Sequence, residues 1–323
     1  MAKKTTTGRS KTVSLSKLSI RDTMALHSDH NQAEGKSADN DRWYHERLSV
    51  FATWMEGRET PTIADITAPV AEAFAVSLRK KTSQFEGHPF RPARKSALSS
   101  HTVNSYIRAL RAFANWLHQA GYLRENPLAG VKPPKTHKAV VDTLTDDEIN
   151  KLLGSIDRST ALGLRDHALL VTYLDTGARC SELLELRLED VHLDDGWLLL
   201  DGKGDKARMV RLGATARAAL RLWERHGRQA MAKENCPYFF VDARWGEKLS
   251  VKAVEQRIGD VAVKALPGRR VYCHLFRHTF ATNYLEYGLG DELHLMATLG
   301  HTTLAMTRQY VDKARFLKAL KER

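Results

Sequence analysis

The sequence has few cysteines and no long apolar segment, and each absence excludes a class of protein. Its 323 residues include three cysteines, Cys180, Cys236 and Cys273, which are isolated and odd in number. They indicate reduced intracellular thiols rather than a disulfide framework or a zinc knuckle. No apolar run approaches the roughly 18 residues needed to span a bilayer. The basic N-terminus lacks the apolar core of a secretory signal, so we expect neither export nor membrane insertion.

The motifs of several common enzyme classes are also missing. His274 and His278 have the i, i+4 spacing of zinc peptidases, but Leu275 stands where H-E-x-x-H requires a glutamate. No clustered carboxylates suggest a two-metal nuclease. The G-K-G stretch at 202–204 is too short for a phosphate-binding Walker motif. Spacing alone leaves a Ser-His-Asp triad open, but no G-x-S-x-G elbow is present. These absences favour chemistry without a metal or another cofactor.

The sequence has an excess of positive charge. Its 50 lysine and arginine residues, against 38 aspartate and glutamate residues, give a formal net charge of +12 and a pI of 9.6. This balance favours a polyanionic partner, because each cation placed on a phosphate releases condensed counterions. A membrane surface fits less well, since no basic amphipathic helix with a strong apolar face stands out. We therefore expect a nucleic acid as the partner.

Hydrophobic periodicity divides the chain into two folded parts. Residues 1–40 are polar and basic, and we expect a flexible segment with at most one short helix around residues 20–26. Residues 41–131 carry three amphipathic stripes, which predict a small helical bundle. Residues 132–143 contain a Pro-Pro pair and predict an extended basic linker. Residues 144–323 then form a second domain with a C-terminal tail.

Basic side chains fall on the edges of the bundle, in the linker and on a later helix. A charged face is more often simply solvated, but here three basic clusters belong to one small bundle, and an extended basic tether could cross a DNA backbone. The candidate DNA-binding residues are Arg91, Arg94, Lys95, Arg108, Arg111, Lys135, Lys138, Lys252 and Arg257.

The second domain is predicted to be mainly helical with one small antiparallel sheet. Residues 191–212 alternate in strand fashion around two turns, and Lys203 lies at the tip of the second hairpin. Arg179 lies in the turn just before a helix N-terminus. Free backbone N–H groups at such a turn, together with the guanidinium, form a favourable anion site.

The stretch from His274 to Tyr310 brings further cations close to a phenol. On a helix, His274 and Arg277 fall roughly 60° apart and can point into one site. Gly300 ends a second short helix, so His301 lies just past a helix end. Taken singly, each residue has an ordinary structural explanation such as packing or capping. Together they suggest covalent phosphate chemistry at the tyrosine.

These residues lie in four motifs that resemble those of the tyrosine recombinases, the phage-integrase and Xer-like family. The family's G-x-R-x-x-E-L appears as GARCSEL at 177–183, and its hairpin lysine motif as GKGDKARMVRL at 202–212. Its H-x-L-R-H-T-F-A-T appears as HLFRHTFAT at 274–282, with Phe276 where leucine is commoner. The histidine and tyrosine register appears as LGHTTLAMTRQY at 299–310.

The resemblance implies both a fold and a mechanism. The fold class would be mainly α with a small antiparallel β-sheet, with an N-terminal core-binding (SAM-like) bundle and a C-terminal mixed α/β catalytic domain. Tyr310 would attack the scissile phosphate and leave a 3′-phosphotyrosine. Two arginines would hold the non-bridging oxygens, a lysine would protonate the departing 5′-oxygen, one histidine would assist proton transfer at the tyrosine and another would add a donor. In that order these residues are Arg179 and Arg277, Lys203, His274 and His301, with Glu182 orienting the first arginine.

The resemblance also implies partners. They are double-stranded DNA and further copies of the chain. Four copies would synapse two sites and exchange strands through a Holliday junction. This would take place in the bacterial cytoplasm, at the nucleoid, without a cofactor. A type IB topoisomerase-like enzyme and a non-catalytic DNA-binding regulator are the rival interpretations, and the complete set of six catalytic residues argues against the second. The sequence leaves open the DNA target, the need for accessory proteins and the biological setting, whether dimer resolution, integration or transposition. It also leaves open whether the tail, with Phe316, Leu317 and Leu320, docks on its own domain or on a neighbouring protomer.

Overall fold

The computed structural model describes residues 17–57, 61–82, 95–135, 141–202 and 207–321. The chain divides into two compact units, Met1–Lys138 and Ala139–Arg323. Within the described ranges, no helix is long and apolar enough to cross a membrane.

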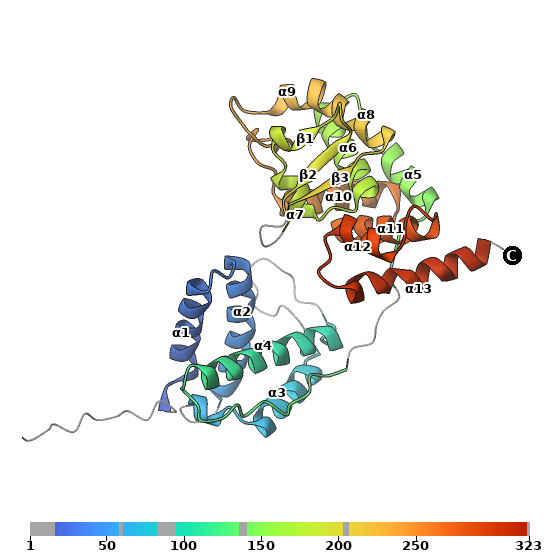
Figure 1. Cartoon of the computed structure of the whole chain (residues 1–323). Helices are drawn as coiled ribbons and strands as arrows, with labels where there is room; N and C mark the ends of the chain where they lie inside the picture. The colour runs from blue at the N-terminus through green and yellow to red at the C-terminus, as the bar shows by residue number, and fades with distance from the viewer. Residues whose placement is uncertain (1–16, 58–60, 83–94, 136–140, 203–206, 322–323) are drawn as a thin grey trace, which may run out of the picture. The chain divides into compact units, whose positions relative to one another are not determined.

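The first unit is a helical bundle (Figure 1), in which α4 packs against both α2 and α3. Serine side chains cap three of its helices, and the N-cap of α4 is Ser99. Phe51, Phe74 and Phe113 are fully buried in the core between the helices. The helices are α1 (Ile20–Ala33), α2 (Ala38–Met55), α3 (Ala68–Lys80) and α4 (Ser100–Gln119).

Helix α1 corrects the expectation of a flexible segment for the described part of that segment, residues 17–40. It is longer than the short helix predicted, and it packs against α2. Its buried positions include His27 and Asn31, which hide its amphipathic pattern. The Asn31 side chain donates to Asp41 over 3.1 Å and accepts from Lys36 over 2.9 Å. Buried polar groups are tolerated when they are hydrogen-bonded in this way, but hydrophobic periodicity does not detect them.

The second unit is mainly helical with a three-stranded antiparallel sheet of order β1-β2-β3. The predicted fold class is confirmed. Leu198 pairs with Val210 across β2 and β3, and both side chains are buried. Its elements are α5 (Asp146–Gly154), α6 (Ala161–Thr176), α7 (Cys180–Glu185), β1 (Val191–His192), β2 (Trp197–Leu200), β3 (Arg208–Arg211), α8 (Ala214–Leu222), α9 (Gln229–Met231), α10 (Val251–Ala265), α11 (Cys273–Glu286), α12 (Glu292–Leu299) and α13 (Leu304–Lys321).

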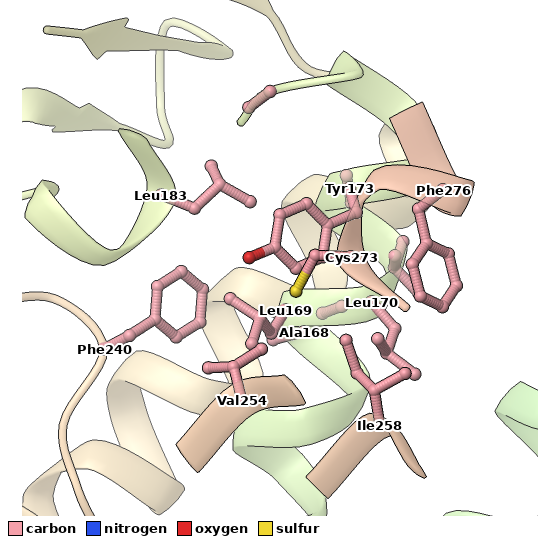
Figure 2. Packing of buried hydrophobic residues seen from close by; sticks show 14 of the residues in the cluster. Ala168, Leu169, Leu170, Tyr173, Leu183, Phe240, Val254, Ile258, Cys273 and Phe276 are labelled. Atoms are coloured by element: carbon pink, nitrogen blue, oxygen red, sulfur yellow. The ribbon is translucent and has the colours of Figure 1, made fainter. Parts of the chain in front are cut away.

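Helix α6 is the centre of this unit and packs against α8 and α11. Figure 2 shows the buried side chains around it, with Tyr173 between Leu183, Cys273 and Phe276. The rings of Tyr173 and Phe276 stack with centroids 6.0 Å apart. This packing fixes the end of α6 against the start of α11, and the candidate site is built where those two ends meet.

Candidate active site

Arg179 is the N-cap residue of α7, immediately after the turn that ends α6. That turn needs Gly177, which adopts φ 60°, and a Cβ there would meet the Phe280 ring at 2.2 Å. The Arg179 guanidinium donates to Glu182 Oε1 over 2.6 Å, and its backbone N–H donates to Oε2 over 2.7 Å. Glu182 therefore fixes both the backbone and the side chain of this arginine, while 31% of the Arg179 side chain stays exposed.

A second arginine, Arg208 of β3, shares the same carboxylate. Its two terminal nitrogens donate to the two oxygens of Glu182 over 2.9 and 2.8 Å, and its Nε donates to the Thr298 carbonyl over 2.8 Å. Burial alone raises the pKa of Glu182, but the hydrogen bonds and charges of Arg208 and Arg179 outweigh it and lower the pKa to about 2. Sequence reasoning did not single out Arg208, although it lies within the hairpin lysine motif.

Arg277 lies on α11 and is 2% exposed. Its terminal nitrogens donate to the carbonyls of Gly177 over 2.7 Å and Leu299 over 2.9 Å. These carbonyls close α6 and α12, where the helix dipole is negative, so they partly compensate the buried charge. Burial, reinforced by the charge of Arg179, lowers the pKa of Arg277 to about 10. It therefore stays a cation at neutral pH, ready to bind an oxyanion.

His301 follows the left-handed Gly300, whose φ is 63° and which ends α12 as predicted. Its Nδ1 lies 2.9 Å from the Thr307 hydroxyl oxygen. Burial and the charges of Arg277 and Arg179 lower the pKa of His301 to about 4, so the ring is neutral at pH 7. In the tautomer whose Nδ1 accepts from Thr307, the proton of the neutral ring sits on Nε2, which can then donate to a ligand.

Tyr310 lies on α13 and is 1% exposed. Its ring is nearly parallel to that of His301, with centroids 6.4 Å apart. Burial raises the pKa of the Tyr310 phenol, and the positive charges of Arg277 and Arg179 oppose that rise in part. Lys313, one turn further on, donates to the Val141 carbonyl over 2.7 Å and holds α13 in place.

His278 of α11 lies beside this tyrosine, and His274 lies beside His278. His274 is exposed, and its ring meets that of His278 edge-on with centroids 4.8 Å apart. Desolvation and the charges of Arg277 and Arg179 lower the pKa of His274. The Nδ1 of His278, and not a nitrogen of His274, lies 2.9 Å from the Tyr310 hydroxyl. Burial and the nearby His274 lower the pKa of His278 to about 4, so it is neutral at pH 7 and can accept a proton.

Sequence reasoning did not assign His278 to the site, although its i, i+4 spacing from His274 was visible. That spacing places both rings on one face of α11, and it was considered only as a metal motif. Among the described residues, no group of three histidine, cysteine or acidic side chains is arranged to hold a metal ion.

The remaining predicted residues are placed less completely. Lys203, Arg91, Arg94 and Lys138 lie outside the described residues. Arg257 is paired through Nε with Asp166 over 2.5 Å, so its charge is partly neutralised within the protein. The candidates with exposed side chains are Lys95, Arg108, Lys135 and Lys252, while Arg111 is partly buried.

The sequence of this chain is similar to those of known proteins. Residues 142–315 match the Phage integrase family. Tyrosine recombinase XerC of Bacillus licheniformis is 36% identical over 221 residues, which are 68% of this chain and 72% of that protein.

Solved structures share the fold. The XerH site-specific recombinase, in a post-cleavage complex with a palindromic difH substrate, matches with a TM-score of 0.70 and 23% identity, over 92% of this chain and 84% of that one. A lambda integrase tetramer bound to a Holliday junction matches with a TM-score of 0.65 and 16% identity, over 91% of this chain and 77% of that one.

Proposed function

The chain belongs to the phage integrase family of tyrosine recombinases, and from this premise we propose how it cleaves and rejoins DNA at specific sites. The observation that carries the mechanism is a fully buried tyrosine whose hydroxyl contacts a neutral histidine and lies within the field of two arginines. The phenol is therefore a nucleophile with a histidine beside it as base and two arginines that can bind the phosphate oxygens.

In the proposed reaction, Tyr310 Oη attacks the scissile phosphorus and the bond to the 5′-oxygen breaks. The product is a 3′-phosphotyrosine and a free 5′-hydroxyl, with Lys203 giving its proton to the departing oxygen. Because the phosphodiester energy is kept in the tyrosyl bond, another 5′-hydroxyl can reverse the step without ATP. That reversal turns cleavage into strand exchange.

Arg179 and Arg277 bind the non-bridging phosphate oxygens in this proposal. Guanidinium groups suit this role because they offer paired donors to two oxygens at once. The carboxylate and carbonyl contacts that hold both arginines fix them before substrate arrives, and His301 adds a third donor. Removing one preorganised donor of this kind typically costs about 3–4 kcal/mol of barrier.

Proton transfer from Tyr310 is assigned to the histidine pair. His278 accepts the phenol proton through its Nδ1, and the solvent-exposed His274 transfers a proton to water. This extends the role that the resemblance gives to His274 alone, since His278 is the ring in contact with the hydroxyl. Because burial raises the pKa of Tyr310, a neighbouring base is needed for attack at neutral pH.

The DNA partner and the assembly follow from the same premise. We propose that the bundle of residues 41–131 and the linker of residues 132–143 bind the duplex through Lys95, Arg108 and Lys135, while residues 144–323 carry the chemistry. Four protomers synapse two sites in this proposal, which the lambda integrase tetramer bound to a Holliday junction supports. We place this activity in the cytoplasm, at the bacterial nucleoid.

The exposed Phe316 of α13 docks on a neighbouring protomer in this proposal. Unchanged synapsis after deletion of residues 312–323 would exclude that contact.

The experiment first maps the DNA bound in cells to find the site, and then uses a nicked duplex carrying it. In EDTA, the wild-type chain is expected to form a covalent protein–DNA adduct, and two intact duplexes are expected to exchange ends. Tyr310→Phe should do neither. A metal requirement, or an adduct with Tyr310→Phe, would sink the mechanism. Adducts on any sequence without exchanged products would instead favour the topoisomerase-like alternative.

A further inference from the structure

Two cysteines far apart in the sequence meet beside the catalytic arginine and histidine. The Cys273 thiol lies against the Cys180 sulfur, with the two Sγ atoms 3.2 Å apart. Cys180 directly follows Arg179 at the start of α7, and Cys273 directly precedes His274 at the start of α11. Both are free thiols. We propose that this pair is a site of reversible oxidation, in which peroxide converts it to a disulfide that slows DNA cleavage.

The surroundings of the pair favour formation of that bond. A disulfide needs its sulfurs about 2 Å apart, so the thiols must approach by roughly 1 Å. Both sit against the packed core of α6, where Figure 2 shows the Cys273 sulfur beside the Tyr173 ring. Within the described part of the chain the buried Tyr173 hydroxyl has no hydrogen-bond partner, so none of its hydrogen bonds is lost when the sulfurs approach each other.

The two sulfurs differ in access and acidity. Cys180 is partly exposed, whereas Cys273 is 5% exposed. The hydrogen bond from Cys273 lowers the pKa of Cys180, and burial opposes that effect only in part. The same interaction and burial raise the pKa of Cys273. Since thiolates are the reactive form, Cys180 is the sulfur that meets the oxidant and Cys273 the one that resolves it.

The chemistry balances in two steps. The Cys180 thiolate attacks one peroxide oxygen, the O–O bond breaks, and a sulfenic acid forms with loss of water after protonation. The Cys273 thiol then attacks that sulfur and expels a second water as the disulfide closes. Each hydrogen peroxide is reduced to two waters while the two thiols lose two electrons. A dithiol reverses the change by thiol–disulfide exchange.

The consequence for activity rests on the proposed function. Drawing the sulfurs together pulls the start of α7 toward the start of α11, and these are the two points that carry Arg179 and His274. A displacement of about 1 Å in a catalytic group can cost about 100-fold in rate. We therefore expect the oxidised chain to form the DNA adduct at least about tenfold more slowly.

The test treats the full-length, freshly reduced chain with hydrogen peroxide. It is then analysed by a non-reducing peptide map and by adduct formation on the nicked duplex. Wild type and the control Cys236→Ser should both give a cross-linked Cys180–Cys273 peptide, form the adduct at least about tenfold more slowly, and regain the original rate with dithiothreitol. Cys180→Ser and Cys273→Ser should give no such peptide and should keep, under peroxide, the adduct formation each shows when reduced.

Absence of the cross-linked peptide from oxidised wild type would overturn the proposal, as would oxygen added to Cys180 without a cross-link. A cross-link that leaves adduct formation unchanged would overturn its functional half. If the reduced chain forms no adduct at all, the proposed function fails, and the peptide map still decides whether the disulfide forms.

Discussion

Glutamine in place of Glu182 is expected to weaken the second unit and its chemistry together. The carboxylate accepts four hydrogen bonds, two from Arg179 and two from Arg208, with its side chain 4% exposed. These interactions lower its pKa from 4.5 to about 2. At 1.36 kcal/mol for each pKa unit, the difference of 4.5 − 2 = 2.5 corresponds to about 3 kcal/mol. Removing one partner of a buried ion pair costs about 3–5 kcal/mol of protein stability, which is a similar amount.

The assay for Glu182→Gln is urea unfolding followed by hydrogen exchange of peptides from α6 and α7, which report on the second unit alone. The matched control is Glu185→Gln on the same helix, which removes an exposed pair with Lys248 and should cost less than about 1 kcal/mol. Adduct formation should fall about tenfold or more in Glu182→Gln alone. Equal stability and equal activity in the two variants would refute the reasoning.

Three further variants or conditions test the site. His278→Ala should slow single-turnover adduct formation by about 100-fold through loss of the proton acceptor, and a rate unchanged from wild type would return that role to His274. Arg208→Ala should slow it by about tenfold by releasing Glu182, and full activity with purified Arg208→Ala would contradict the positioning role. His278 and His301 have pKa values lowered to about 4, below their ordinary 6.5. The unfolded chain therefore binds their protons first, so stability present above pH 6.5 should be lost as pH falls toward 4, and His301→Gln should flatten that slope in a urea titration.

Local signals in the sequence predicted much of the second unit. The helix end at the left-handed Gly300 and the antiparallel strands within residues 191–212 both occur as expected. Each depends on residues close together in the chain, where turn and capping chemistry is decided. Local turn and capping signals also placed Arg179 before a helix N-terminus, and it is the N-cap of α7.

Contacts between distant segments were not predictable in this way. Arg208 of β3 reaches Glu182 on helix α7, and Cys180 meets Cys273 only because α6 and α11 pack together. The sequence shows that His278 follows His274 by four residues. It does not show that His278 contacts Tyr310, because that contact depends on how α13 packs. Helix α1 was underestimated because its buried side chains are partly polar. In each case the missing information was tertiary packing.

The most direct test of the account is the chemical identity of the covalent link. The adduct formed in EDTA on the nicked duplex would be digested with protease and nuclease, and the nucleotide-bearing peptide sequenced by tandem mass spectrometry. The account predicts a single peptide with a nucleotide joined through its 3′-phosphate to Tyr310. A nucleotide on any other residue, or a link through a 5′-phosphate, would contradict it.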